Sequence, residues 1–141
     1  MKLQEALREL TAVAKRITRD DASAWEDRAL RREVGHAAAE CDALWALVKY
    51  MVSEVSKTGV PGMTGSCLKL YYSDLKQRIG ELSMRLLGRA ALTRDDIAGL
   101  PSQEIVYNAL QSLSMTIAAG SSQIQRNIIS ERILGLPKER R

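Results

Sequence analysis

The chain of 141 residues contains one histidine and two cysteines, and both shortages limit the chemistry that it can carry. Glu33 and His36 form a single Glu-x-x-His pair, whereas a di-metal helical bundle needs two such pairs and further carboxylates. A Ser-His-Asp hydrolase would depend on the same histidine, and no serine lies in a Gly-x-Ser-x-Gly elbow. Cys41 and Cys67 lack Cys-x-x-Cys spacing, so we expect two reduced thiols. The sequence therefore predicts neither a metal site nor a hydrolase.

Long hydrophobic runs are also missing. No stretch approaches the roughly 20 apolar residues that cross a bilayer as a helix. The first residues, Met-Lys-Leu-Gln-Glu-Ala, are too acidic and amphipathic for a signal peptide. We expect a cytoplasmic protein with no membrane span.

Neither sign of charge dominates, since the formal net charge is only +4. Acids and bases recur at i,i+4 spacing, as in Asp74 with Arg78, which is typical of solvated helix faces. Only residues 132–141 are locally basic, and they lack the aromatic side chains of a nucleic-acid surface. The glycine-rich residues 59–65 lack a following Gly-Lys-Ser, so they connect two helices rather than hold phosphate. Nucleic acid is not a predicted partner.

Phenylalanine is absent, whereas alanine and leucine are abundant, and this balance favours helices packed through small and straight side chains. We expect one all-α domain over residues 1–141, because this length is too short for a catalytic and a cofactor domain together. The first apolar stripe predicts a helix over residues 3–17. A second, long helix is predicted to begin near Ala24, where Ser23 and Glu26 have capping-box spacing. Its expected buried residues are Leu30, Val34, Ala37, Cys41, Leu44, Val48, Met51 and Val55.

The second half of the chain predicts a third helix that stops at Gly88, a capped turn over residues 93–100 and a fourth helix that begins at Pro101. Gly120 interrupts this helix, and Ser121 and Ser122 recap the chain for a last segment that ends at Gly135 and Pro137. The expected architecture is an up-down four-helix bundle with a bent or split last helix. The inward-facing residues predicted for its last part are Ile105, Ala109, Leu113, Ile117, Ile124, Ile128, Ile129 and Leu134.

Residues 118–137, A-A-G-S-S-Q-I-Q-R-N-I-I-S-E-R-I-L-G-L-P, resemble the C-terminal signature of the acyl-CoA dehydrogenase family, and residues 66–88 are similar to the long helix before it. The resemblance implies the C-terminal helical domain of such a protein, without the helical and β domains that precede it in the family. It also implies FAD as cofactor, with Gly120, Ser121 and Gln123 at the positions that contact it. A glycine break before a helix N-terminus suits polar cofactor groups, because the first-turn N–H groups point outward.

The residue before this glycine often supplies the catalytic base in the family, and here it is Ala119, which cannot take a proton. Some relatives carry the base on the first turn of the first long helix, and that turn would precede Met1. The resemblance thus implies the C-terminal domain of a flavin-dependent enzyme that desaturates acyl-CoA, contributing flavin cover and oligomer contacts and inactive alone. The alternative is a non-catalytic helical subunit that pairs with a complete dehydrogenase. Under both hypotheses an exposed apolar face predicts a homo- or hetero-oligomer.

Overall fold

The computed structural model describes residues 2–19, 21–60, 62, 64–93, 96, 99 and 102–138. Five α-helices account for most of these residues: α1 (Lys2–Arg16), α2 (Arg28–Thr58), α3 (Thr64–Leu87), α4 (Ser102–Met115) and α5 (Ser122–Ile128). The predicted all-α class is confirmed. Met1, the predicted helix start at Pro101, most of the predicted turn at 93–100 and the basic residues Arg140 and Arg141 lie outside the described residues.

Short elements complete the described part of the chain. The 3-10 turn η1 (Ala24–Glu26) precedes α2, and a second one, η2 (Gly88–Leu92), follows α3. A π-helical turn, η3 (Ile129–Ile133), extends α5. The sequence does not predict the two-residue antiparallel pair between β1 (Thr18–Arg19) and β2 (Ala22–Ser23).

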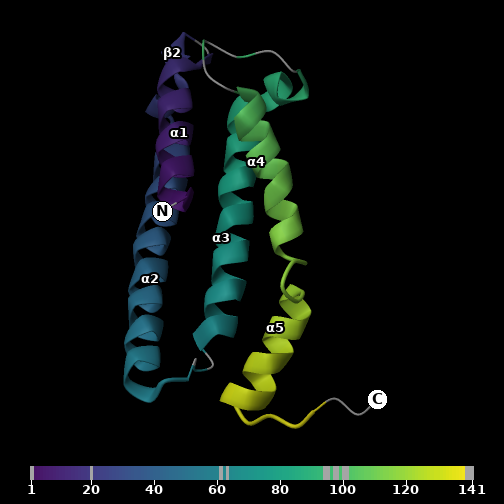
Figure 1. Cartoon of the computed structure of the whole chain (residues 1–141). Helices are drawn as coiled ribbons and strands as arrows, with labels where there is room; N and C mark the ends of the chain where they lie inside the picture. Colours follow the sequence, from purple (N-terminus) through teal and green to yellow (C-terminus); the bar gives the residue numbers. More distant parts are fainter. Residues whose placement is uncertain are drawn as a thin grey trace.

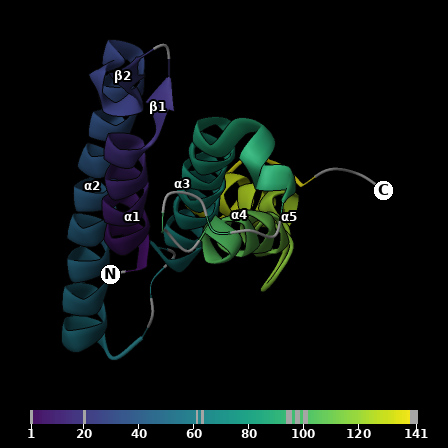
Figure 2. The same cartoon turned by 90° about the horizontal axis from the view of Figure 1, so that it is seen from above.

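Helices α1, α2 and α3 and the segment formed by α4 and α5 run in alternating directions, and α3 lies in the middle of the molecule (Figure 1). Seen from above, α1 and α2 lie on one side of α3, whereas α4 and α5 lie on the other (Figure 2). The main core fills the space where α1, α2 and α3 meet, and its most deeply buried large side chains are Leu3, Leu10, Leu44 and Leu75. The structure confirms the up-down bundle with a split last helix.

The start of α2 differs from the prediction. Asp27 is its N-cap, since the Asp27 carboxylate accepts a hydrogen bond from the Ala29 N–H at 2.8 Å. Ser23 instead caps η1, where its hydroxyl oxygen accepts from the Trp25 N–H at 3.2 Å. The same hydroxyl donates to the Ala14 carbonyl at 3.1 Å, which ties the turn back to α1. The predicted start near Ala24 was therefore wrong, because Ser23 belongs to the reversal between the helices.

The predicted ends of α2 and α3 are confirmed. Gly59 caps α2 in the left-handed region with φ 71°, and its N–H donates to the Val55 carbonyl at 2.8 Å. Gly88 follows α3 with φ 55°. The buried face of α2 is complete from Val34 to Leu44, whereas Val48 and the later residues are only half-buried. The reason is that α1 runs along only part of α2 (Figure 1).

Helices α3 and α4 approach each other most closely at Gly80. A Cβ atom at this position would lie 3.0 Å from the Ser112 hydroxyl oxygen and 3.1 Å from the Ala109 Cα. The buried Ser112 and Ser83 hydroxyls donate to carbonyls of their own helices, at 2.6 Å to Ala109 and 2.9 Å to Ile79. Small side chains therefore set the separation of the two helices.

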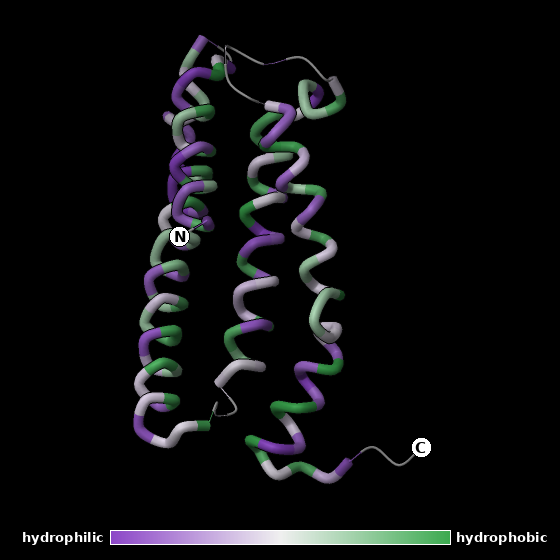
Figure 3. The backbone as a smooth tube through the Cα atoms, viewed as in Figure 1, coloured by the Kyte–Doolittle hydropathy of each residue, from purple (hydrophilic) through white to green (hydrophobic). Residues whose placement is uncertain are grey.

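The inward stripe predicted for the last part of the chain is only partly correct. Ile105 and Ala109 are buried against α3, but several later members are largely exposed: Leu113 (50%), Ile117 (72%), Ile124 (53%) and Leu134 (64%). Apolar residues recur along the whole α4 and α5 segment (Figure 3). Helical periodicity identifies an apolar face, but α3 covers only part of it. The prediction of inward-facing residues was wrong at these four positions.

Candidate functional site

The break between α4 and α5 is the candidate site indicated by the sequence. Helix α4 ends at Met115, a turn follows, and Ala119 and Gly120 both have positive φ angles, 55° and 94°. The Ser122 N–H closes the break by donating to the Thr116 carbonyl at 3.0 Å. Two successive residues in the left-handed region turn the chain out of α4 before α5 continues in the same general direction (Figure 1), and the second is a glycine, which adopts a positive φ without a steric penalty.

Gly120 has a further reason to lack a side chain. A Cβ atom there would lie 2.8 Å from the Gln125 side-chain nitrogen, Nε2. Gln125 is buried, with 8% of its surface exposed, and Nε2 donates to the Ala119 carbonyl at 3.1 Å. The amide thus occupies the space beside Gly120 and holds the preceding peptide group.

The three residues predicted to contact a cofactor lie together at this break. Ser121 is the N-cap of α5, and its hydroxyl oxygen accepts from the Ile124 N–H at 3.3 Å. Gln123 is exposed in the first turn of the same helix, whereas Ser122 is buried. Ala119, at the family base position, is exposed and offers only a methyl group. The site therefore presents a hydroxyl and an amide but no proton acceptor at residue 119.

Sequence reasoning missed Lys69 as part of this site. The Lys69 ammonium nitrogen, Nζ, donates to the Gly120 carbonyl at 2.7 Å and lies 3.5 Å from the Thr116 carbonyl oxygen. On α3, Lys69 shares a helical stripe with Ser73 and Gly80, both of which are buried. The signal in the sequence is a lysine at helical spacing from small residues, on the face of α3 that packs against α4. This signal could have revealed that Lys69 contacts the break.

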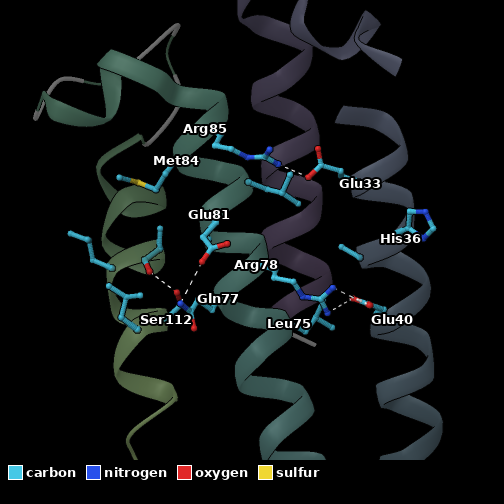
Figure 4. Close-up of a pocket in the computed structure, with 16 residues that line it drawn as sticks. Glu33, His36, Glu40, Leu75, Gln77, Arg78, Glu81, Met84, Arg85 and Ser112 are labelled. Carbon is cyan, nitrogen blue, oxygen red and sulfur yellow. Dashed lines mark hydrogen bonds and ion pairs between the residues drawn. The ribbon is translucent and has the colours of Figure 1, made fainter. Parts of the chain in front are cut away.

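A groove of about 910 Å³ between α2, α3 and α4 is a second candidate (Figure 4). Four of its charged side chains are paired across α2 and α3, since Arg78 contacts Glu40 at 2.6 Å and Arg85 contacts Glu33, and Glu81 accepts from Gln77 of its own helix at 3.4 Å. His36 is exposed at its edge. Within the described ranges, no three His, Cys, Asp or Glu residues form a group that could hold a metal ion. The groove offers fewer unpaired polar groups than the break and is the weaker candidate.

The perturbed ionisable groups lie away from the break. Burial, together with the charges of Glu104 and Glu5, raises the pKa of Glu9. Glu9 lines a cavity of about 270 Å³ between α1, α3 and α4. Burial also raises the pKa of the Cys41 thiol, which keeps it protonated, and both cysteines are free as predicted.

In the part of the chain that the structure describes, none of the helices combines the length and the apolar character that a bilayer span requires. The antiparallel bundle, split at a glycine before its last helix, places the chain in the class of all-α domains. The family described as "Acyl-CoA dehydrogenase, C-terminal domain" matches residues 1–134, and the chain belongs to this family.

Curated relatives support the assignment. The chain is 39% identical over 71 residues to acyl-CoA dehydrogenase IpdE1 of Mycobacterium tuberculosis, a match that covers 50% of this chain and 18% of that protein. It is 32% identical over 94 residues to acyl-CoA dehydrogenase FadE34 of the same organism, covering 66% of this chain and 12% of that protein. The chain thus spans less than a fifth of the length of these relatives.

Solved structures share the fold. In the ChsE4–ChsE5 complex from Mycobacterium tuberculosis, a chain with 23% identity superposes with a TM-score of 0.75, over 97% of this chain and 36% of that one. A structure titled as an FAD-dependent dehydrogenase gives a TM-score of 0.79 at 19% identity, over 96% of this chain and 34% of that one. At these identities the likeness concerns the fold alone.

Proposed function

We propose that the chain acts as the C-terminal domain of a flavin-dependent acyl-CoA dehydrogenase. The reaction is α,β-desaturation of an acyl-CoA, in which a base removes the α-proton and a hydride leaves the β-carbon. The observation that carries this proposal is the break at Ala119 and Gly120, after which Ser121 caps α5 and Gln123 lies exposed in its first turn. FAD, when bound, supplies the hydride acceptor.

The residues at the break fit a polar cofactor. Gly120 must lack a side chain, because the Gln125 amide fills the space where its Cβ would lie. The exposed Gln123 amide both donates and accepts hydrogen bonds, and the Ser121 hydroxyl, an acceptor within the helix cap, still has a hydrogen to donate. We therefore assign Gly120, Ser121 and Gln123 to contacts with the flavin dinucleotide, as cover over the cofactor.

Ala119 is the reason to expect no dehydrogenase activity from the isolated chain. Its methyl group cannot remove a proton, so the base must lie in another part of the assembled protein, together with most of the acyl-CoA site. We expect the 141-residue chain to be inactive by itself.

The exposed apolar residues of α4 and α5 are proposed as contacts with the rest of the enzyme or with a neighbouring subunit. The ChsE4–ChsE5 complex is named as an assembly of two different chains, which makes a hetero-oligomer as reasonable as a homo-oligomer for this protein. The proposed location is the cytoplasm.

A second function is favoured by the same alanine. The chain would be a non-catalytic helical subunit that pairs with a complete dehydrogenase carrying its own base. The intact mass of the protein recovered from its source cells separates the two: a mass near 15.6 kDa supports the subunit, and a mass of a full dehydrogenase supports the domain.

The test of the site uses the native assembly and the change Gln123→Ala. We expect about a tenfold loss of flavin affinity, since a hydrogen bond to a buried polar group is removed. Gln111→Ala changes an exposed glutamine of α4 outside the break and serves as the matched control. Unchanged flavin affinity in Gln123→Ala, or turnover of acyl-CoA by the isolated chain, would contradict the proposal.

A further inference from the structure

Lys69 connects the middle of the bundle to the break between α4 and α5. The residue is half-buried in the second turn of α3. Its Nζ donates to the Gly120 carbonyl at 2.7 Å and lies within 3.5 Å of the Thr116 carbonyl oxygen. One ammonium group therefore contacts the peptide groups on both sides of the turn.

The backbone of this turn needs external hydrogen-bond donors. The Thr116 carbonyl directly follows the end of α4, where carbonyls lack partners within the helix and carry a partial negative charge that a cation stabilises. The Ala119 carbonyl accepts from Gln125, and the Thr116 carbonyl accepts from the Ser122 N–H. Lys69 supplies the donor for Gly120, and a charge-assisted bond of this kind is stronger than one between neutral groups.

We propose that Lys69 is a positioning residue, whose ammonium fixes the backbone of the break at Ala119 and Gly120 so that Ser121 and Gln123 face the flavin. The proposal rests on the function proposed above. Lys69 of α3 holds the Gly120 carbonyl, and Gln125 of α5 holds the adjacent Ala119 carbonyl. Two residues with positive φ angles then keep one conformation, although the turn is partly exposed.

A simple tether between α3 and α5 is a different role, and the chain has one. Asp74 of α3 and Arg126 of α5 lie 3.9 Å apart with exposed side chains, an arrangement that solvent screens. This pair does not contact the turn. Asp74→Asn is therefore a matched control that weakens the link between α3 and α5 and leaves the break intact.

The first experiment measures amide hydrogen exchange by NMR in the 141-residue chain. Lys69→Met is expected to speed exchange at the Ser122 and Ile124 amides by about tenfold to a hundredfold, since a bond to a charged group is lost. Lys69→Arg, which keeps the charge, and Asp74→Asn are expected to change it by less than about threefold. Unchanged protection in Lys69→Met, with native α1 and α2 spectra, would overturn the proposal.

If Lys69→Met does not fold, Lys69→Gln replaces it, because it removes the charge, shortens the reach of the side chain and leaves it polar. Faster exchange confined to the turn supports the proposal, and exchange equal to that of the wild type overturns it.

The second experiment measures flavin affinity in the native assembly. Loss of affinity in Lys69→Met, by about tenfold, with recovery in Lys69→Arg, supports the positioning role. If Gln123→Ala weakens flavin binding and Lys69→Met does not, the positioning role is wrong and the proposed site stands. If neither variant weakens it, the proposed site itself fails.

Discussion

Replacement of Gly80 by alanine tests how closely α3 and α4 are packed. The added Cβ would lie 3.1 Å from the Ala109 Cα, a backbone atom that moves only if α4 moves. Overpacking of this kind costs about 1–3 kcal/mol of unfolding free energy. Alanine in place of glycine within a helix returns about 1 kcal/mol. We expect Gly80→Ala to be destabilised by a net of about 0–2 kcal/mol.

Gly35 provides the matched control, because it lies within α2 and a Cβ there would meet no atom within 4 Å. Gly35→Ala should therefore gain only the helix-propensity term, about 0.5–1 kcal/mol. The difference between the two variants isolates the contact with α4 and amounts to about 1–3 kcal/mol.

Urea unfolding followed by circular dichroism at 222 nm measures both free energies, and thermal melts provide a check. For a chain of this size, 1 kcal/mol corresponds to a shift of about 3 °C in Tm. If Gly80→Ala is as stabilising as Gly35→Ala, the close approach of α3 and α4 is wrong, and so is the account of how α4 is placed.

Two further predictions concern the break and the cavity beside α1. Gly120→Ala should destabilise α5 by about 1 kcal/mol or more, because its φ of 94° is strained for alanine and the added Cβ displaces the Gln125 amide. Gly135 also has a positive φ, but a Cβ there would meet no atom within 4 Å, so Gly135→Ala is the control. Equal effects of the two variants on thermal melts would refute the contact with Gln125. Glu9 has a raised pKa, so the folded chain binds its proton more tightly than the unfolded chain and loses stability as the pH rises above the ordinary value of 4.5. Glu9→Gln should therefore be more stable than the wild type at neutral pH and lose this advantage as the pH falls toward 4.5; a constant difference in urea midpoint would contradict it.

Much of the fold follows from local signals in the sequence. Apolar residues at helical spacing predict the helices, and Gly59, Gly88 and Gly120 predict where the chain leaves them, because each has a positive φ. The start of α2 was predicted too early because both Ser23 and Asp27 are good caps. Only the strand pair between α1 and η1 decides which residue caps which element.

The site was predictable only in its own segment. The string around Gly120 indicates Ser121 and Gln123, but the supports come from elsewhere: Lys69 is far away in sequence, and its role depends on how α3 packs against the turn. The exposure of Leu113 and Ile117 was not predictable for a similar reason. Periodicity shows that a helix face is apolar, and it does not say which neighbour covers that face.

The central position of α3 affects how this chain unfolds. One side of α3 completes the core formed with α1 and α2, and the other side carries the packing of α4 and α5 (Figure 2). Among the described residues, α4 and α5 contribute only Ile105 to the buried part of the main core, so we expect this segment to open before α1, α2 and α3. Loss of α3, in contrast, would remove the support of both halves at once. The candidate site therefore lies in the segment that we expect to open first, and a partner bound to this segment would stabilise it.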